Sequence, residues 1–296
     1  EAALLVANKI ALGQIDCGIA GGVDTTSDAP IAVNEGLRQV LLQANRGKSL
    51  MGRLQPFLKL RPHHLKPELP RNGEPRTGLS MGEHCERMAK TWHIGRAEQD
   101  ALALRSHQAL AGAYAEGWQD DLLTPFMSLA RDNNLRPDLT LEQLARLKPA
   151  FDRTDEGTLT AGNSTPLTDG ASLVLLGTEE WAQQQGLEVL AYLVDGETAA
   201  VDFVTGREGL LMAPVYAVPR LLARNGLTLQ DFDYYEIHEA FAAQVLCTLK
   251  AWEDADYCRE QLGLSAPLGA IDRARLNVKG SSLGAGHPFA ATGGRI

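Results

Sequence analysis

Cysteine is scarce in this sequence: among 296 residues there are only four, Cys17, Cys85, Cys247 and Cys258, and no two stand in a CxxC spacing. That scarcity argues against a disulfide framework and against a zinc site built on paired cysteines. We therefore expect a reducing compartment, the cytoplasm, and no bound metal.

Long apolar runs are missing as well, since no stretch approaches the roughly 20 residues that a membrane-spanning helix needs. No signal peptide is visible either, but the sequence begins inside a helical pattern, so its true N-terminus is open. The composition, 44% hydrophobic and 22% charged with 29 glycines, is typical of a globular α/β protein. The length suits one large domain or two ordinary ones.

Positive charge is in deficit: 28 Lys and Arg stand against 37 Asp and Glu, a net charge of −9. This argues against a nucleic-acid partner. One part of the chain is the exception, the basic segment (residues 46–76), where only Glu68 and Glu74 are acidic. Its basic residues are Arg46, Lys48, Arg53, Lys59, Arg61, Lys66, Arg71 and Arg76. The segment is either a solvated loop or, as we prefer in an otherwise acidic protein, a contact for phosphates, an acidic membrane surface or a partner subunit.

The last twenty residues, NVKGSSLGAGHPFAATGGRI, hold the first candidate catalytic group. A run of small residues leads to His287, and Pro288 suits the first turn of a helix. His287 is thus expected at or just before a helix N-terminus, where the positive end of the dipole disfavours imidazolium. A neutral ring in this position can accept a proton as a base.

A second histidine has a similar setting. FDYYEI (residues 232–237) reads as a short buried strand and HEAFAAQVLCTLKAW (residues 238–252) as a helix with an apolar face. His238 falls at the junction, which is where α/β folds commonly carry functional groups. Two histidines in such settings indicate a catalytic site without naming its reaction.

HEAFAAQ and GSSLGAGHPFAATGGR together resemble the paired C-terminal motifs of the thiolase family, and the HEAF form resembles its fatty-acid-oxidation branch. GTLTAGNSTPLTDGASLVLL (residues 157–176) resembles another family segment. The resemblance implies the α/β thiolase fold, a layered α-β-α-β-α arrangement of two βαβαβαββ halves with an inserted loop domain. Residues 1–29 and 167–185 would belong to the N-terminal half, 30–166 to the loop domain, and 186–296 to an incomplete C-terminal half.

The activity implied by the resemblance is that of a 3-oxoacyl-CoA thiolase, which cleaves its substrate with coenzyme A in β-oxidation or runs the reverse condensation. Coenzyme A and acyl-CoA would be substrates, with no covalently bound cofactor. His287 would activate the nucleophile. His238 would donate a hydrogen bond to a developing oxyanion.

The resemblance also assigns residues that face coenzyme A. Met81 would line the pantetheine channel, although a core methionine filling a gap is an equal interpretation. Arg136 would stack on the adenine end, or is simply solvated. The turn with Ala161, Ser164 and Thr165 would touch pantetheine amides. Implied partners are a second copy of the chain or more, and a hydratase/dehydrogenase subunit.

The resemblance leaves the catalytic cysteines outside the sequence. Residues 1–24, a helix and then a buried strand, resemble the family segment that follows the nucleophile, so that cysteine is expected before Glu1. The acid/base cysteine is expected after Ile296. Cys17 lies mid-strand in an apolar run and is rejected as a substitute. We therefore expect the 296-residue chain by itself not to turn over.

Two rival functions remain open. One is a non-catalytic thiolase-like protein that binds acyl-CoA or lipid or serves as a structural subunit, and the two intact histidine motifs favour the enzyme over it. The other is a nucleotide-binding domain, disfavoured because no GxGxxG or GxxxxGK[ST] follows a strand. Further elements are expected as a helix at 33–44, an irregular Pro-rich loop after it, two helices within 80–117, a strand at 171–177, a strand-like segment at 187–200 and a helix within 209–227.

Overall fold

The computed structural model of the chain describes residues 1–70, 72–205 and 208–296. Two compact units can be distinguished, one made of residues 1–25 and 74–296 and the other of residues 26–73. Arg71, counted above in the basic segment, lies outside the described residues. The predicted division into two thiolase halves and a loop domain over 30–166 stays a prediction.

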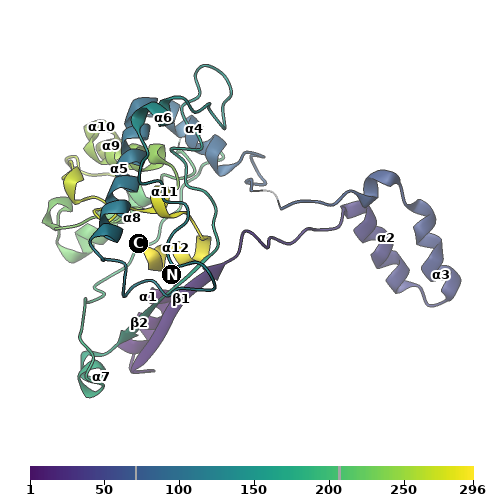
Figure 1. Ribbon diagram of the computed structural model, residues 1–296, viewed down its shortest axis with the longest axis horizontal. Helices are drawn as coiled ribbons and strands as arrows, with labels where there is room; N and C mark the ends of the chain where they lie inside the picture. The colour runs from purple at the N-terminus through teal and green to yellow at the C-terminus, as the bar shows by residue number, and fades with distance from the viewer. Residues whose placement is uncertain (71, 206–207) are drawn as a thin grey trace. The chain divides into compact units, whose positions relative to one another are not determined.

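The first unit contains a helix and a two-stranded antiparallel sheet (Figure 1). Helix α1 (Ala2–Ala11) packs on strand β1 (Cys17–Asp24), which pairs with β2 (Gly170–Gly177). Cys17 stands opposite Gly177, and Asp24 opposite Gly170. The helix and both strands were predicted from the sequence, and their pairing joins segments about 150 residues apart in the chain. The predicted burial of β1 is wrong, since Ile19 and Val23 are each 66% exposed. Cys17, expected in the middle of this strand, is its first residue.

Helix α9 (Ala242–Glu253) forms the centre of the hydrophobic core, because all of its residues from Ala242 to Leu249 are buried. Phe241, Val245, Leu249 and Trp252 are buried together, as their helical spacing predicts. Around α9 pack α4 (Met81–Thr91), α5 (Arg96–Ala115), α8 (Ala213–Asn225) and α10 (Ala255–Glu260).

Short elements complete this unit. They are α6 (Leu141–Ala145), α7 (Glu179–Gln184), η3 (Leu229–Asp231), η4 (Arg273–Arg275), α11 (Ser282–Ala285), η5 (Phe289–Ala291) and α12 (Thr292–Arg295). The last three lie within the C-terminal motif, and η5 packs against β1. Among the described helices, none has both the length and the apolar character needed to span a bilayer.

The second unit is a small helical hairpin. Helix α2 (Glu35–Arg46) packs against α3 (Leu50–Leu54), η1 (Gln55–Lys59) and η2 (Pro62–Leu65). The predicted helix over 33–44 is thus found two residues later. The irregular loop expected after it is wrong in part, because Ser49 caps α3 by accepting the N–H of Gly52.

Three local predictions fail. Residues 187–200 form no strand, because no described segment pairs with them, and Leu190 and Val194 remain exposed. Residues 232–237 make only one ladder contact, the parallel bridge between Tyr235 and Leu276. Beyond it, a side chain, Asn277, takes over the pairing of Ile237. The helix expected from His238 begins at Ala242, so His238 lies in the loop before it.

Candidate active site

The structure brings the two motif histidines together. The ring centroids of His238 and His287 lie 4.2 Å apart with 40° between the ring planes. His238 precedes α9 by four residues, and His287 lies between α11 and η5. Phe289 also contacts the ring of His287, with a centroid distance of 4.8 Å.

The backbone of His287 is anchored to the segment that leads into β2. Its N–H donates to Pro166 O at 2.9 Å, and its carbonyl accepts the N–H of Thr168 at 3.3 Å. Gly286 has φ 104°, and a Cβ there would lie 2.5 Å from Thr168, so glycine is required on both counts. Beyond His287, the N–H of Ala290 donates to Asp24 at 3.1 Å, which ties η5 to the end of β1.

Each histidine has a hydroxyl partner on its Nδ1 atom. Ser282 Oγ lies 2.6 Å from Nδ1 of His238, and Thr292 Oγ1 lies 2.6 Å from Nδ1 of His287. Both hydroxyls come from the C-terminal motif itself. Because Nδ1 is engaged, Nε2 is the nitrogen left for chemistry on each ring.

Both rings are neutral near pH 7. Burial lowers the pKa of His238 to about 4, and the neighbouring His287 contributes in the same direction. Burial also lowers the pKa of His287, opposed by the carboxylate of Asp24. The neutral state was predicted, but its cause was not: desolvation is the main effect, and η5, with three residues, is too short to carry a large dipole.

Glu239, which is 1% exposed, was not predicted from the sequence to belong to the site. Its carboxylate accepts hydrogen bonds from Ser106 Oγ (2.6 Å), Asn277 Nδ2 (2.8 Å) and Leu283 N (3.2 Å). Burial raises its pKa, and these hydrogen bonds oppose that effect. Glu239 therefore joins α5, the segment before the C-terminal motif, and α11. The sequence does contain a signal for Glu239, because an acidic residue stands directly after a motif histidine and before the apolar residues AFAA.

Asn277 fixes the segment that leads to His238. Its Oδ1 accepts the N–H of Ile237 at 2.8 Å, and its Nδ2 donates to Ile237 O at 2.9 Å. The side chain thus imitates a neighbouring strand for one residue. Asn277 Nδ2 also donates to the side chain of Glu239 at 2.8 Å, so Asn277 bonds the backbone of the residue before His238 and the carboxylate of the residue after it.

The turn predicted to touch pantetheine lies against the histidine motifs. Thr165 N donates to Ala240 O at 3.0 Å, and Ala242 N donates to Asn163 O at 3.0 Å. Thr165 Oγ1 also donates to Ser282 O at 2.5 Å. Within the turn, the buried Asn163 accepts the N–H of Thr160 at 2.7 Å and leaves Ala161 exposed. Ser164 and Thr165 are therefore in the same neighbourhood as His238.

Two buried polar atoms here have no partner within the described part of the chain, His238 Nε2 and Ser164 Oγ. A buried polar group left without a hydrogen bond costs about 1–3 kcal/mol. A polar ligand bound at this site would supply the missing hydrogen-bond partners. The arrangement can therefore bind an oxygen-bearing group and polarise it.

The two other predicted residues have different surroundings. Met81 is half-buried and packs on the edge of the core around α9. Arg136 is exposed, and its guanidinium donates to the carbonyls of Asn133, Asn134 and Leu135 at 3.0–3.2 Å. Among the described residues, no hydrogen bond, ion pair or ring contact joins Met81 or Arg136 to the histidine pair.

The cysteines do not serve this site. Cys85 and Cys247 are buried in the core around α9, where desolvation raises the pKa of both thiols, that of Cys247 to about 12. Cys258 is buried in α10. Cys17 lies five residues along β1 from Gly22, the residue packed against Ala290, and five strand residues span about 16 Å. The thiol is thus at the far end of the strand.

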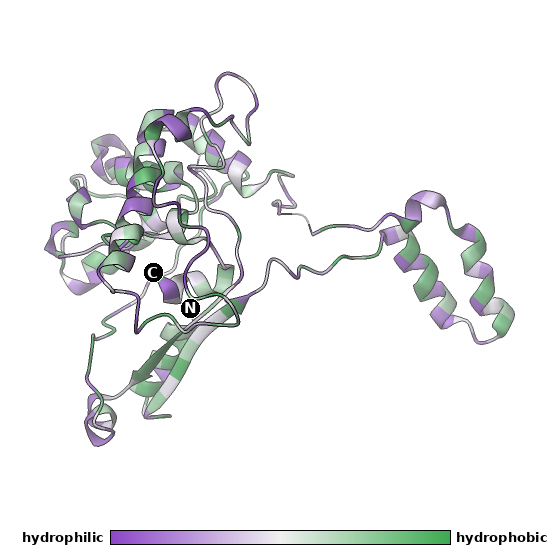
Figure 2. Ribbon diagram, viewed as in Figure 1, coloured by the Kyte–Doolittle hydropathy of each residue, from purple (hydrophilic) through white to green (hydrophobic). Residues whose placement is uncertain are grey.

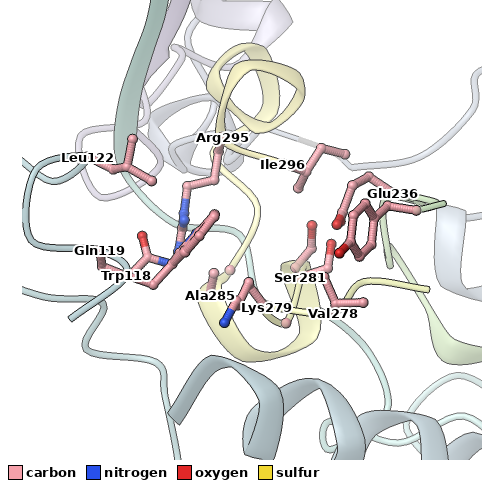
Figure 3. A pocket seen from close by; sticks show the side chains of 14 residues that line it. Trp118, Gln119, Leu122, Glu236, Val278, Lys279, Ser281, Ala285, Arg295 and Ile296 are labelled. Atoms are coloured by element: carbon pink, nitrogen blue, oxygen red, sulfur yellow. The ribbon is translucent and has the colours of Figure 1, made fainter. Parts of the chain in front are cut away.

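A cavity lies beside the site. It has a volume of about 530 Å³ and is bordered by Glu236, Ser281, Arg295 and Ile296, with Trp118 on one flank (Figure 3). Ser282 is among its lining residues, but neither histidine is. The cavity also holds a buried polar atom without a partner among the described residues, Gln119 Oε1. The histidine pair is nevertheless the candidate active site, because it brings the two histidine motifs together. Among the described residues, no group of three or more His, Cys, Asp or Glu is arranged to hold a metal ion.

Comparison with protein families and known proteins gives one consistent result. The family model described as "Thiolase, N-terminal domain" matches residues 1–180, and "Thiolase, C-terminal domain" matches residues 187–296. The chain is 45% identical over 302 residues to a 3-ketoacyl-CoA thiolase of Yersinia pestis and to one of Yersinia pseudotuberculosis. In both cases the match covers 100% of this chain and 68% of the relative.

Solved structures agree with the sequence comparisons. The acetyl-CoA acetyltransferase of Bacillus anthracis superposes with a TM-score of 0.75 at 32% identity, covering 100% of this chain and 67% of the other. The human mitochondrial 3-ketoacyl-CoA thiolase has a TM-score of 0.76 at 26% identity, covering 100% and 66%. The Acat5 thiolase of Ascaris suum, solved in complex with coenzyme A, has a TM-score of 0.76 at 26% identity, covering 100% and 67%.

Proposed function

The chain belongs to the thiolase family and has the thiolase fold, and from this premise we propose that it cleaves 3-oxoacyl-CoA with coenzyme A, yielding acetyl-CoA and a shortened acyl-CoA. The reverse condensation uses the same groups. The observation that carries the proposal is the contact between His238 and His287, which unites the two family motifs at a site with unpaired buried polar atoms.

Cleavage needs two acyl transfers. A cysteine thiolate attacks C3 of the substrate, the C2–C3 bond breaks, and its electron pair leaves on the enolate of acetyl-CoA, which takes up a proton. The thiolate of a second coenzyme A then attacks the acyl-enzyme and releases the cysteine. We assign the attacking thiolate to none of the four cysteines of this chain, because Cys17 is remote from the histidine pair and the other three are buried.

We assign the role of base to His287. In a neutral ring with hydrogen on Nδ1, that hydrogen donates to Thr292 Oγ1, and Nε2 is free to take the thiol proton. His238 acts as the donor to the enolate or thioester oxygen. Its pKa, lowered to about 4, keeps the ring neutral, so that it donates without protonating the intermediate.

Coenzyme A is the proposed thiol substrate. Two solved relatives, the Ascaris suum thiolase and the human mitochondrial 3-ketoacyl-CoA thiolase, were determined in complex with it. We propose that Ser164 and Thr165 face the pantetheine close to His238 and that Ala161 marks the exposed end of that turn. Met81 and Arg136 would contact the pantetheine and adenine ends. For Arg136 this requires exchange of its carbonyl partners for the ligand.

We further propose that the protein acts in the cytoplasm in fatty-acid β-oxidation and assembles at least as a dimer, with a hydratase/dehydrogenase subunit as a further partner. The scarcity of cysteine supports the cytoplasm. The resemblance to the fatty-acid-oxidation branch supports the pathway and the assembly. Sedimentation of the purified protein, alone and with that subunit, tests the assembly.

The basic segment suits a peripheral contact with an anionic membrane. In the unit of residues 26–73, Leu50 is 76% exposed and Met51 74%, at the turn between α2 and α3. Figure 2 shows apolar residues between polar ones along both helices. The exposed Arg46, Lys48 and Arg53 flank that turn. Apolar side chains beside basic ones are the pattern of surfaces that enter the lipid headgroup region.

The direct test of the proposed function is product analysis. The natural gene product, incubated with a 3-oxoacyl-CoA and coenzyme A, should give acetyl-CoA and an acyl-CoA two carbons shorter, identified by mass spectrometry. Omission of coenzyme A should stop the reaction after one equivalent of acetyl-CoA. Recovery of the free 3-oxo acid instead would identify a hydrolase and contradict the proposal.

A further inference from the structure

The hydrogen bond between Ser282 and His238 has a consequence for the free side of the ring. Ser282 is 1% exposed and lies in the first turn of α11. Its Oγ is 2.6 Å from His238 Nδ1, and no other partner of this hydroxyl is found among the described residues. The proton of the hydroxyl therefore has one acceptor within reach, the Nδ1 lone pair.

A neutral imidazole carries one hydrogen, so the partner of one nitrogen determines the state of the other. If Nδ1 accepts from Ser282, the ring hydrogen is on Nε2. The alternative, Nδ1–H donating to Ser282, would leave the buried serine proton without an acceptor. Nε2 is itself buried and unpaired, so an N–H there points to an oxygen ligand.

We propose that Ser282 is a positioning residue: its hydroxyl holds His238 in the Nε2–H tautomer and so makes that ring the donor to the thioester or enolate oxygen. This rests on the proposed thiolase function for the identity of the oxygen, but not for the tautomer. Ser282 acts through His238 and itself touches no reacting atom.

The position of Ser282 is fixed independently of the ring. The N–H of Leu283 donates to the buried Glu239, and the carbonyl of Ser282 accepts from Thr165 Oγ1. The backbone around Ser282 is thus held by Glu239, three residues before α9, and by Thr165. The hydroxyl is oriented before any ligand arrives, and a ligand does not have to reorganise it.

The tautomer is measurable without catalysis. In the chain labelled with ¹⁵N-histidine, the ring shifts of His238, identified by comparison with His238→Asn, should show hydrogen on Nε2 at pH 7. Ser282→Ala should abolish that preference, and Ser282→Thr should keep it. Hydrogen on Nδ1 in the wild-type chain would overturn the proposal, whatever the outcome of activity assays.

A double-mutant cycle in the natural gene product tests the role in turnover. We expect Ser282→Ala to lower kcat about 10- to 100-fold with little change in KM, and to have no further effect when His238 is already Asn. The control is Ser281→Ala, which removes an equally buried neighbour whose Oγ faces Ile237 O, not the ring. An equal loss from Ser282→Ala in both backgrounds would overturn the proposal. No thiolysis by the wild type would instead contradict the proposed function alone.

Discussion

At the scale of residues, hydrogen bonds between side chains far apart in the chain define the site. In both His238 and His287, Nδ1 is hydrogen-bonded to a hydroxyl. The rings differ in the role that we assign to Nε2, which is a hydrogen-bond donor in His238 and a base in His287. The motifs identified both rings from the sequence alone. Ser282, Thr292 and Glu239 were not identified, because small polar residues in a Gly-rich run look alike until the fold shows which one meets the ring.

His238 should tolerate asparagine better than alanine. Asparagine retains an N–H donor near the same place, whereas alanine leaves the oxygen without one. We expect His238→Asn to keep activity within about 10-fold of the wild type and His238→Ala to lose about 10²- to 10³-fold in kcat. The measurement is steady-state thiolysis by the natural gene product. Equal losses for the two variants would show that hydrogen-bond donation at this position does not matter.

Acid should destabilise the protein through His238. Its pKa is about 4 in the folded chain against 6.5 in the unfolded one, so the unfolded chain takes up the proton first as the pH falls. The stability that depends on a neutral His238 is fully present above pH 6.5 and is lost as the pH falls from 6.5 to 4. Because the ring is only partly buried, we expect about 1–2 kcal/mol by pH 5.

Urea unfolding at pH 7 and pH 5 checks this for the wild type and for His238→Asn. Glu236 and Glu239, whose pKa values burial raises, titrate in both proteins, so the difference between them isolates the histidine. The wild type should lose more stability than the variant. An identical pH dependence would mean that His238 titrates normally in the folded chain.

At the scale of elements, helices were predicted well from their periodicity, whereas extended segments were predicted poorly. The apolar face of α9 is readable because a helix satisfies its own backbone. The segment at 187–200 has the composition of a strand, but a strand also needs a partner, and composition does not specify one. Residues 232–237 show the intermediate case, where Asn277 substitutes for a neighbouring strand.

Glu239 should be the most sensitive residue at this scale, since it joins three elements. Glu239→Gln places an amide N–H₂ where hydrogen bonds were accepted from Ser106, Asn277 and Leu283, and we expect a loss of about 2–4 kcal/mol in unfolding free energy. Glu188→Gln, at an exposed acid of the same unit, is the control and should change stability by less than about 0.5 kcal/mol. Equal effects in urea denaturation would contradict the structural role of Glu239.

At the scale of the whole molecule, charge is divided between the two units. Residues 26–73 contain eight Lys or Arg against three Asp or Glu, a net charge of +5 in a chain whose total is −9. The asymmetry was visible in the sequence. The exposed leucine and methionine beside it were not, because burial of the α2–α3 hairpin depends on its packing. The net positive charge and the exposed apolar side chains together support the membrane contact more specifically than the charge alone.

Through the unit of residues 26–73, the protein should bind vesicles rich in anionic lipid and not vesicles of phosphatidylcholine alone. We expect reversal of Arg46, Lys48 and Arg53 to Glu to weaken binding about 100-fold or more, at about 1 kcal/mol per basic residue. Leu50→Glu should weaken it too, whereas Met127→Glu, at an exposed methionine of the other unit, should not. Vesicle flotation at low and high salt measures this. Equal binding to neutral vesicles would contradict the proposed contact.

The central claim is that His287 activates the thiol of a thiolase, and single-turnover acylation measures that step directly. With a 3-oxoacyl-CoA and no added coenzyme A, release of the first acetyl-CoA by the natural gene product reports thiolate attack alone. His287→Ala should slow this release about 10²- to 10⁴-fold. His93→Asn, at an exposed histidine whose φ of 51° asparagine tolerates, should leave it unchanged. A rate for His287→Ala within twofold of the wild type would contradict the account.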